Sequence, residues 1–350
     1  MKIIEGIHSI FDGYLYDEHG LNCFLVPKYV ASQAFRRINP DLYYFYLYTH
    51  LHYFFLSEKP YEHFMSNNRY QRDTIEEYVL SDKLGLKLEA VRIDNNLIEQ
   101  VQQALVKDAI VFVPTNKRAI FYCEEYQRRD HPHLFLVKGF DEERNLAIIQ
   151  DGEQNAALFN SPPSPTLRMS IGDTTSQFYL RNDMLESAFD AYNETYGYHK
   201  EHILIMSYSH APSVHSAADA IKELSQLMSA YVGREQEILE PKLKYLIEEV
   251  DQFRIPYINT HMIFFRALAR LIVQVPELQN RRTELDILAR ECQIAWKIIA
   301  TKIGILHKRN RFEPEKLNES FSNVIVLEKK VINLVLDFGK MLRFEEMKMN

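Results

Sequence analysis

The chain is poor in cysteine, glycine and tryptophan: its 350 residues include three, eleven and one of them, respectively. Three scattered cysteines are too few for a disulfide framework or for a zinc site built on thiolates. No apolar run approaches about 18 residues, the length that a membrane-spanning helix needs. The first residues, MKIIEGIHSIFDGY, show no long apolar core and no cleavage signature of a signal peptide. We therefore expect no membrane span, and a cytoplasmic setting that keeps thiols reduced.

Basic residues are outnumbered as well. The chain has 41 Lys and Arg against 48 Asp and Glu, which gives a net charge of −7 at pH 7. This balance argues against general nucleic-acid binding, which relies on basic surfaces. Hydrophobic residues make up 46% of the chain, so a sizeable core can form. The length fits two domains of about 100–200 residues each.

The character of the sequence changes near residue 212. Residues 1–212 mix short strand-like runs with helical stretches, whereas residues 213–350 contain only three glycines. In this second part apolar residues recur with helical spacing, which indicates a bundle of about four helices. We expect an α+β chain with one domain at 1–212 and an all-α helical domain at 213–350.

A β-hairpin is predicted from His131 to Asp151, HPHLFLVKGFDEERNLAIIQD. Two apolar runs, Leu134–Val137 and Leu146–Ile149, flank a connection that contains glycine and several acids. In an antiparallel pair the start of one strand lies beside the end of the next. The side chains of His133 and Asp151 are therefore expected at the same end of the hairpin, where a carboxylate can orient an imidazole.

Alternatives remain open at both positions. His131 also precedes the strand, although His133 has the better offset to Gly139. His133 could equally be a histidine that only ends a strand. Asp151 could equally be the first residue of a turn that continues into Gly152.

Cys23 is the best candidate for a nucleophile. It lies in HGLNCFLVPKYVASQAF, where Gly20 predicts a turn and residues 24–35 predict a helix. The positive end of a helix dipole stabilises a thiolate. Most free cysteines are buried apolar residues, and we interpret Cys292 in this way because it lies on the apolar face of a predicted helix. Cys123 lies in a connecting segment with no helix dipole to activate it. The order Cys, His, Asp along the chain is that of papain-like proteases, although a triad is recognised by geometry.

An oxyanion hole needs two hydrogen-bond donors near the developing charge. The backbone N–H of Cys23 is expected to be the first. The second could be the side chain of Asn22 or a donor from the N-terminal segment. Asn116, just after an apolar β run, is a further candidate to face the site.

These residues together resemble the N-terminal domain of the butirosin biosynthesis protein H family, over roughly residues 1–210. The resemblance is carried by the helix that Cys23 leads, by the strand-terminal Asp151, and by the H-x5-G-[FY]-D pattern at His133, Gly139, Phe140 and Asp141. It implies a papain-like cysteine-protease fold with a catalytic triad of Cys23, His133 and Asp151.

The resemblance also implies a reaction and its partners. The expected enzyme is an acyltransferase that takes an acyl group from an acyl or peptidyl carrier protein onto cysteine and passes it to a small-molecule amine. Its setting would be specialised, antibiotic-like metabolite biosynthesis. The only expected cofactor is the phosphopantetheine of the donor carrier protein, and no metal is expected. The alternatives are a peptidase or amidase with the same triad and a non-catalytic binding module with the same fold.

Two further groups are candidates for substrate and carrier binding. An aromatic stretch between Tyr43 and Phe54, which includes Tyr46 and Tyr48, is either a core segment or one wall of an acyl pocket. Arg128 and Arg129 are either a solvated basic face or a docking point for a phosphopantetheine phosphate or an acidic carrier.

Overall fold

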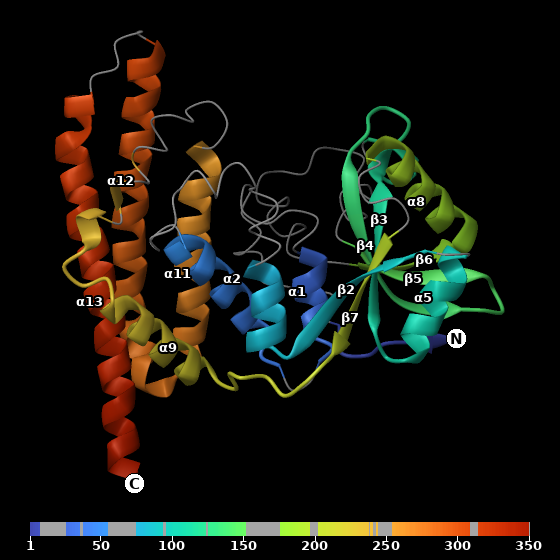
Figure 1. Cartoon of the computed structure of the whole chain (residues 1–350), viewed down its shortest axis with the longest axis horizontal. Coiled ribbons are helices and arrows are strands. Elements are labelled where there is room, and N and C mark those ends of the chain that lie inside the picture. The colour runs from blue at the N-terminus through green and yellow to red at the C-terminus, as the bar shows by residue number, and fades with distance from the viewer. Residues whose placement is uncertain are drawn as a thin grey trace. The chain divides into compact units, whose positions relative to one another are not determined.

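The computed structural model describes residues 1–7, 26–35, 38–54, 75–93, 96–123, 125–151, 176–196, 202–237, 239–240, 243, 254–308 and 314–349. The chain forms two compact units (Figure 1). The first comprises Met1–Pro40 and Leu80–Ser213, and the second comprises Asp41–Val79 and Val214–Asn350. The fold is of the expected α+β class, with an antiparallel sheet in the first unit and a helical region in the second.

The first unit is built on a seven-stranded antiparallel sheet. Six strands lie in the order β2-β7-β3-β4-β5-β6, and β1 pairs with one end of β4. The strands are β1 (Lys2–Ile3), β2 (Leu86–Arg92), β3 (Ile110–Asn116), β4 (Pro132–Asp141), β5 (Leu146–Asp151), β6 (Ser176–Arg181) and β7 (His202–Tyr208). The central strands β3, β4 and β5 are buried almost throughout, because they carry the apolar runs of the sequence.

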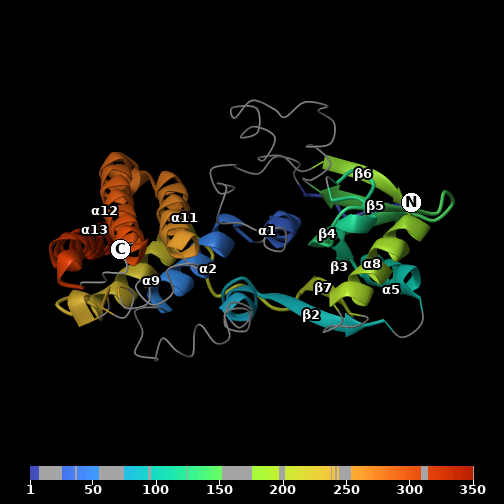
Figure 2. The same ribbon diagram turned by 90° about the horizontal axis from the view of Figure 1, so that it is seen from above.

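The described residues of this unit include the helices α1 (Val26–Ser32), α5 (Leu97–Val106) and α8 (Asn182–Tyr196). Helix α5 begins where the side chain of Asn96 accepts hydrogen bonds from the backbone N–H groups of Ile98 and Glu99. Its apolar face, formed by Leu97, Val101 and Leu105, shares a core with alternate residues of the sheet and with α8. Figure 2 shows α5 and α8 side by side next to the strands. Short helical turns lie at Val79–Lys83, where the chain returns to the first unit, and at Lys117–Ala119.

The predicted hairpin is confirmed as β4 and β5. Leu136 pairs with Gln150 and Val137 with Ile149, and the register then shifts at Lys138 before it resumes at Gly139. Strand β1 pairs with β4 at this point, opposite Gly139 and Phe140. It lies so close that a Cβ atom at position 139 would collide with the carbonyl oxygen of Lys2. The glycine of the H-x5-G pattern is thus needed for the approach of the first strand.

The second unit contains helices α2 (Asp41–Phe54), α9 (Ala217–Ser229), α11 (Arg254–Val273), α12 (Arg282–Lys308) and α13 (Asn318–Met349). Short 3-10 turns at Pro276–Arg281 and Pro314–Leu317 precede α12 and α13. Helices α11, α12 and α13 pack in sequence, and α9 packs along α13. This arrangement agrees with the helical bundle expected from the periodicity of the sequence.

The domain division differs from the expected one in one respect. The second unit begins at Val214, next to the expected boundary, but it also takes Asp41–Val79, which we assigned to the first domain. Helix α2 is apolar on all sides, and such a helix needs a surrounding core. It packs against α11, and its first residue, Asp41, accepts hydrogen bonds from Arg270 and Gln274 at 2.9 and 2.6 Å.

Candidate catalytic dyad

His133 lies near the start of β4, in a buried position. Its side chain is 3% exposed, and in the sheet it pairs with Thr115 of β3. The imidazole contacts the ring of Phe135 edge to face, with ring centres 5.6 Å apart. Phe135 belongs to the core that α5 and α8 share with the sheet. The ring of His133 is therefore held by a rigid strand and an aromatic neighbour.

The hairpin brings His133 and Asp151 together, as the sequence predicted. Nε2 of His133 lies 3.1 Å from Oδ1 of Asp151, whose side chain is 6% exposed at the end of β5. An ionised carboxylate can only accept hydrogen bonds, so Nε2 carries the proton in this contact. In the neutral imidazole the lone pair is then on Nδ1, the nitrogen that can take a proton from a nucleophile.

Tyr122 completes the surroundings of the carboxylate, and the sequence analysis missed this role. Its hydroxyl donates to Oδ2 of Asp151 at 2.8 Å, while Oδ1 faces the histidine. Its ring packs edge to face on Phe178 of β6, with centres 5.2 Å apart. The two oxygens of Asp151 are thereby fixed by different partners. Tyr122 lies in an irregular turn, where no periodic pattern could have identified it.

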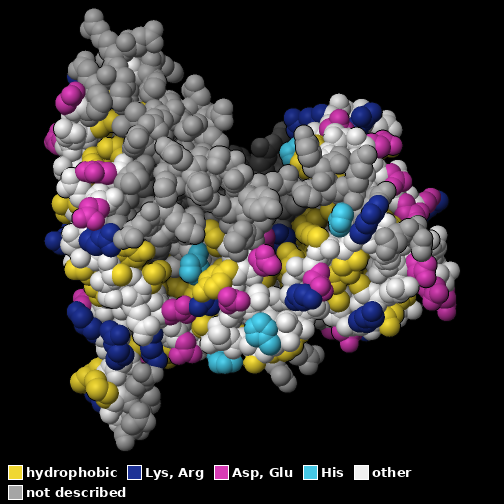
Figure 3. Space-filling model, viewed as in Figure 1, with side chains coloured by type: hydrophobic (Ala, Val, Ile, Leu, Met, Phe, Trp, Pro, Cys, Tyr) yellow, Lys and Arg dark blue, Asp and Glu magenta, His cyan; other side chains and the backbone are white. Residues whose placement is uncertain are grey.

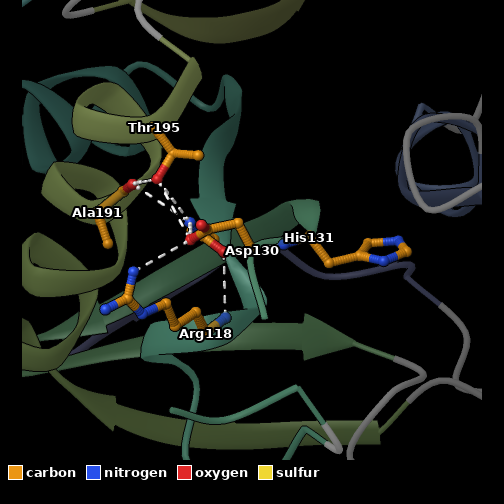
Figure 4. A network of polar contacts seen from close by, with 6 residues as sticks. Arg118, Asp130, His131, Ala191 and Thr195 are labelled. Carbon is orange, nitrogen blue, oxygen red and sulfur yellow. Dashed lines mark hydrogen bonds and ion pairs between the residues drawn. The ribbon is translucent and has the colours of Figure 1, made fainter. Parts of the chain in front are cut away.

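Of the two candidate histidines, His133 is the one that contacts Asp151. The side chain of His131 is 45% exposed, and its Nδ1 lies 3.9 Å from the carboxylate of Glu125. That separation is too long for a direct hydrogen bond. In Figure 4 the His131 ring projects away from the polar network around Asp130. The described contacts thus give the buried His133 a close acid partner, whereas the acid nearest the more exposed His131 is too far away for a direct hydrogen bond.

Asn116 has a structural role, which corrects the expectation that it faces the site. Its amide nitrogen donates to Oδ1 of Asp130 at 2.8 Å and to Oγ1 of Thr195 at 3.1 Å. Its amide oxygen accepts from the backbone N–H groups of Arg118 and His131, both at 3.1 Å. Figure 4 shows this network between α8 and the segment that leads into β4. The amide of Asn116 is fully engaged in fixing the residues before β4.

The basic residues before β4 differ in exposure. Arg128 is exposed, and the side chain of Arg129 is 69% exposed while its Nη2 lies 3.1 Å from Glu125. Lys117, in contrast, is buried. Burial raises the pKa of Glu125, but a backbone hydrogen bond and the charges of Lys117, Arg129 and His131 outweigh it, so this pKa is lowered overall. Arg128 and Arg129 remain accessible to a partner.

Cys23 and Asn22, the predicted nucleophile and oxyanion donor, lie outside the described residues. The predicted helix that follows is confirmed as α1 from Val26, which places Pro27 in its first turn, where proline fits. Cys123 and Cys292 are both buried. Burial is the main cause that raises the pKa of the Cys292 thiol, and the negative charge of Glu328 raises it further. The interpretation of Cys292 as a core residue is confirmed.

Tyr46 and Tyr48 are buried residues of α2 in the second unit, at 2% and 3% exposure. The hydroxyl of Tyr46 donates to Glu223 of α9 at 2.8 Å. Burial, together with the charge of Glu223, raises the pKa of Tyr46 well above its usual value. Both rings belong to the core of the helical unit, and the site proposed below does not include them.

Comparisons with models of protein families and with curated protein sequences find no match to this chain. Among the described residues, none of the helices has the length and apolar character required to cross a bilayer. Figure 3 shows Lys and Arg side chains interspersed with Asp and Glu over the described part of the visible face. The features that point to a function are therefore the geometry around His133 and the sequence pattern that precedes it.

Proposed function

We propose that the chain is a cysteine-dependent acyltransferase of papain-like fold, with Cys23 as nucleophile, His133 as general base and Asp151 as the residue that orients the imidazole. The observation that carries the proposal is the buried contact of 3.1 Å between His133 and Asp151. Burial of a charged residue is costly unless the residue is well paired, and Asp151 has such a partner in His133. A histidine that a carboxylate orients is the base that activates a thiol in cysteine-dependent enzymes.

The proposed reaction has two steps. In the first, Nδ1 of His133 takes the proton of the Cys23 thiol, and the thiolate attacks the carbonyl carbon of a carrier-protein thioester. The phosphopantetheine thiolate leaves with that proton, and Cys23 holds the acyl group. In the second, an amine attacks the acyl-enzyme, its proton passes to His133, and Cys23 is released as a thiol. Asn22 and the backbone N–H of Cys23 would stabilise the oxyanion in both steps.

The favoured setting is specialised metabolite biosynthesis in the cytoplasm, with an acyl or peptidyl carrier protein as donor partner. This part of the proposal is supported by the resemblance described above and by the exposure of Arg128 and Arg129. Transfer to an amine and hydrolysis by water share the first step, so only the fate of the acyl-enzyme separates them.

A test of the acceptor uses the isolated acyl-enzyme. The chain is first acylated with a carrier-bound acyl group, freed of donor and then divided into samples with and without candidate amines. The proposal predicts slow loss of the acyl group alone and rapid formation of an amide with at least one amine, both followed by mass spectrometry. Fast release of the free acid that no amine changes would overturn transfer in favour of hydrolysis.

A further inference from the structure

Helix α12 presents an exposed stripe of isoleucines in the helical unit. Ile287, Ile294, Ile298 and Ile305 expose 54%, 58%, 44% and 44% of their surface. Their spacings of seven, four and seven residues place them on one face of the helix, in the pattern that forms the seam of a coiled coil. Large apolar side chains gathered on one exposed face mark an interaction surface.

The stripe is symmetric about Trp296. Ile294 and Ile298 lie two residues to either side of it, and Ile287 and Ile305 lie nine residues to either side. A two-fold interface between identical chains requires such self-complementarity, because residue i contacts residue j and j contacts i. In an antiparallel pair of α12 helices, Ile287 would meet Ile305 of the second copy, and Ile294 would meet Ile298.

The charges along the same face favour the antiparallel orientation. Glu284 and Glu291 occupy exposed positions of the stripe near its N-terminal end. A parallel pair would set each of them against its own copy, and like charges at such positions destabilise a helix pair. In the antiparallel pair, Glu291 lies level with Thr301 of the second copy, one turn from its Lys297.

A groove beside the stripe supplies further complementarity. It lies between α12 and α13, has a volume of about 620 Å³, and its charged lining residues are Glu284, Glu291, Asp337 and Lys330. Three of these four are acids: Glu284 and Asp337 pair with Arg281 and Lys340 at 2.7 and 3.0 Å, and Glu291 adds a further negative charge. The antiparallel arrangement brings residues 301–308 of the second copy, TKIGILHK, to this level, and that segment carries two lysines and no acid.

We propose that this face of α12 binds a second copy of the chain, with the two α12 helices antiparallel and centred on Trp296. The occupant is a second copy because the apolar positions are symmetric and the acidic end of the face matches the basic end of the same helix. This inference is independent of the proposed catalysis, since all its residues belong to the helical unit.

Sedimentation of the full chain tests the association. The proposal predicts a species of twice the chain mass of 41.3 kDa at micromolar concentration. The pair Ile294→Lys and Ile298→Lys should convert it to a monomer with unchanged circular dichroism, because both side chains are exposed. Val106→Lys, at a 64% exposed residue of the other unit, is the matched control and should leave the dimer intact. A monomeric wild type, or a dimer that survives the double substitution, overturns the proposal.

Engineered thiols test the orientation. Ile287→Cys chains mixed with Ile305→Cys chains should form a disulfide-linked dimer under mild oxidation. Each variant alone should not, because the two identical positions would be 18 residues apart along the antiparallel pair, about 27 Å. The wild-type chain under the same oxidant controls for its own cysteines. Efficient cross-linking of either variant with itself would overturn the antiparallel arrangement.

Discussion

At the scale of single residues, the carboxylate of Asp151 is the centre of the proposed site. One oxygen faces Nε2 of His133, and the other accepts from Tyr122. The sequence allowed the first contact to be predicted, because strand pairing fixes which ends of a hairpin meet. It gave no sign of the second, since the position of Tyr122 depends on an irregular turn and on the packing of Phe178.

Tyr122→Phe should therefore slow catalysis without unfolding the protein. A hydrogen bond to a charged group contributes about 1.5–3 kcal/mol. If half of this orients Asp151 in the transition state, the acylation rate falls by roughly 4- to 12-fold. Stopped-flow measurement of Cys23 acylation checks this value. Tyr126→Phe, at an exposed residue of the same turn, is the control. Equal rates for both variants would mean that the tyrosine only fills space.

Glu125 gives a pH-dependent contribution to stability. Its pKa is lowered in the folded chain, despite burial, by a backbone hydrogen bond and by Lys117, Arg129 and His131. A lowered pKa stabilises the fold above the ordinary carboxyl value of 4.5, and this contribution is lost as the pH falls through the folded value.

Glu125→Gln should accordingly lower the melting temperature at pH 7, and the difference from wild type should shrink towards pH 3. Thermal melts across this range measure it. Glu142→Gln, at an exposed residue of the hairpin turn, should show no such trend. A difference that is constant with pH would assign the effect to packing instead of charge.

At the scale of elements, the periodic spacing of apolar residues explains which strands and helices could be predicted from the sequence. The hairpin forms where its two apolar runs predict it. Helix α5 likewise has a clear pattern, since Leu97, Val101 and Leu105 recur with helical spacing and are buried. Strand β2 is harder to predict, because the residues that lead into it, from 66 onward, are mostly polar. Its strand begins after Gly85, which has a φ of 66° and lies so close to the backbone of His210 that a Cβ would collide. Gly85 and His210 are far apart in the sequence, so no local sequence pattern could indicate this contact.

Gly139 links the hairpin to the first strand, and Gly139→Ala should destabilise the first unit. A methyl group at this position would meet the backbone of β1, and an overpacked site costs about 1–3 kcal/mol. Urea unfolding measures the loss. In a chain that lacks residues 1–4 the same substitution should cost clearly less, because the colliding strand is gone. An equal cost in both chains would contradict this account.

At the scale of the whole molecule, the two units could be predicted but their membership could not. The boundary near residue 213 follows from the change in periodicity. The assignment of α2 to the helical unit depends on contacts of Asp41 with Arg270 and of Tyr46 with Glu223, about 180 to 230 residues away in sequence. Composition alone left α2 as either a core segment or a pocket wall. Its burial agrees with the core segment, but composition could not say which core the helix joins.

The carrier protein is expected to dock near Arg128 and Arg129, two exposed cations on a chain of net charge −7. Attraction between exposed charges weakens over a Debye length of roughly 8–10 Å near physiological salt. Arg128→Glu with Arg129→Glu should slow acylation by carrier-bound substrate, most strongly at low salt. Acylation by an N-acetylcysteamine thioester should stay nearly unchanged. An equal loss with both substrates would assign the arginines to the fold.

The most direct test of the central claim is the rate at which iodoacetamide labels each cysteine at pH 7, mapped by peptide mass spectrometry. The account predicts that Cys23 reacts at least tenfold faster than Cys123 and Cys292, which are buried. His133→Ala should reduce the rate at Cys23 to that of an ordinary thiol, because the base that takes its proton is lost. Slow labelling of Cys23, or a fast rate that His133→Ala leaves unchanged, would contradict the assignment of His133 and Asp151 to the activation of Cys23.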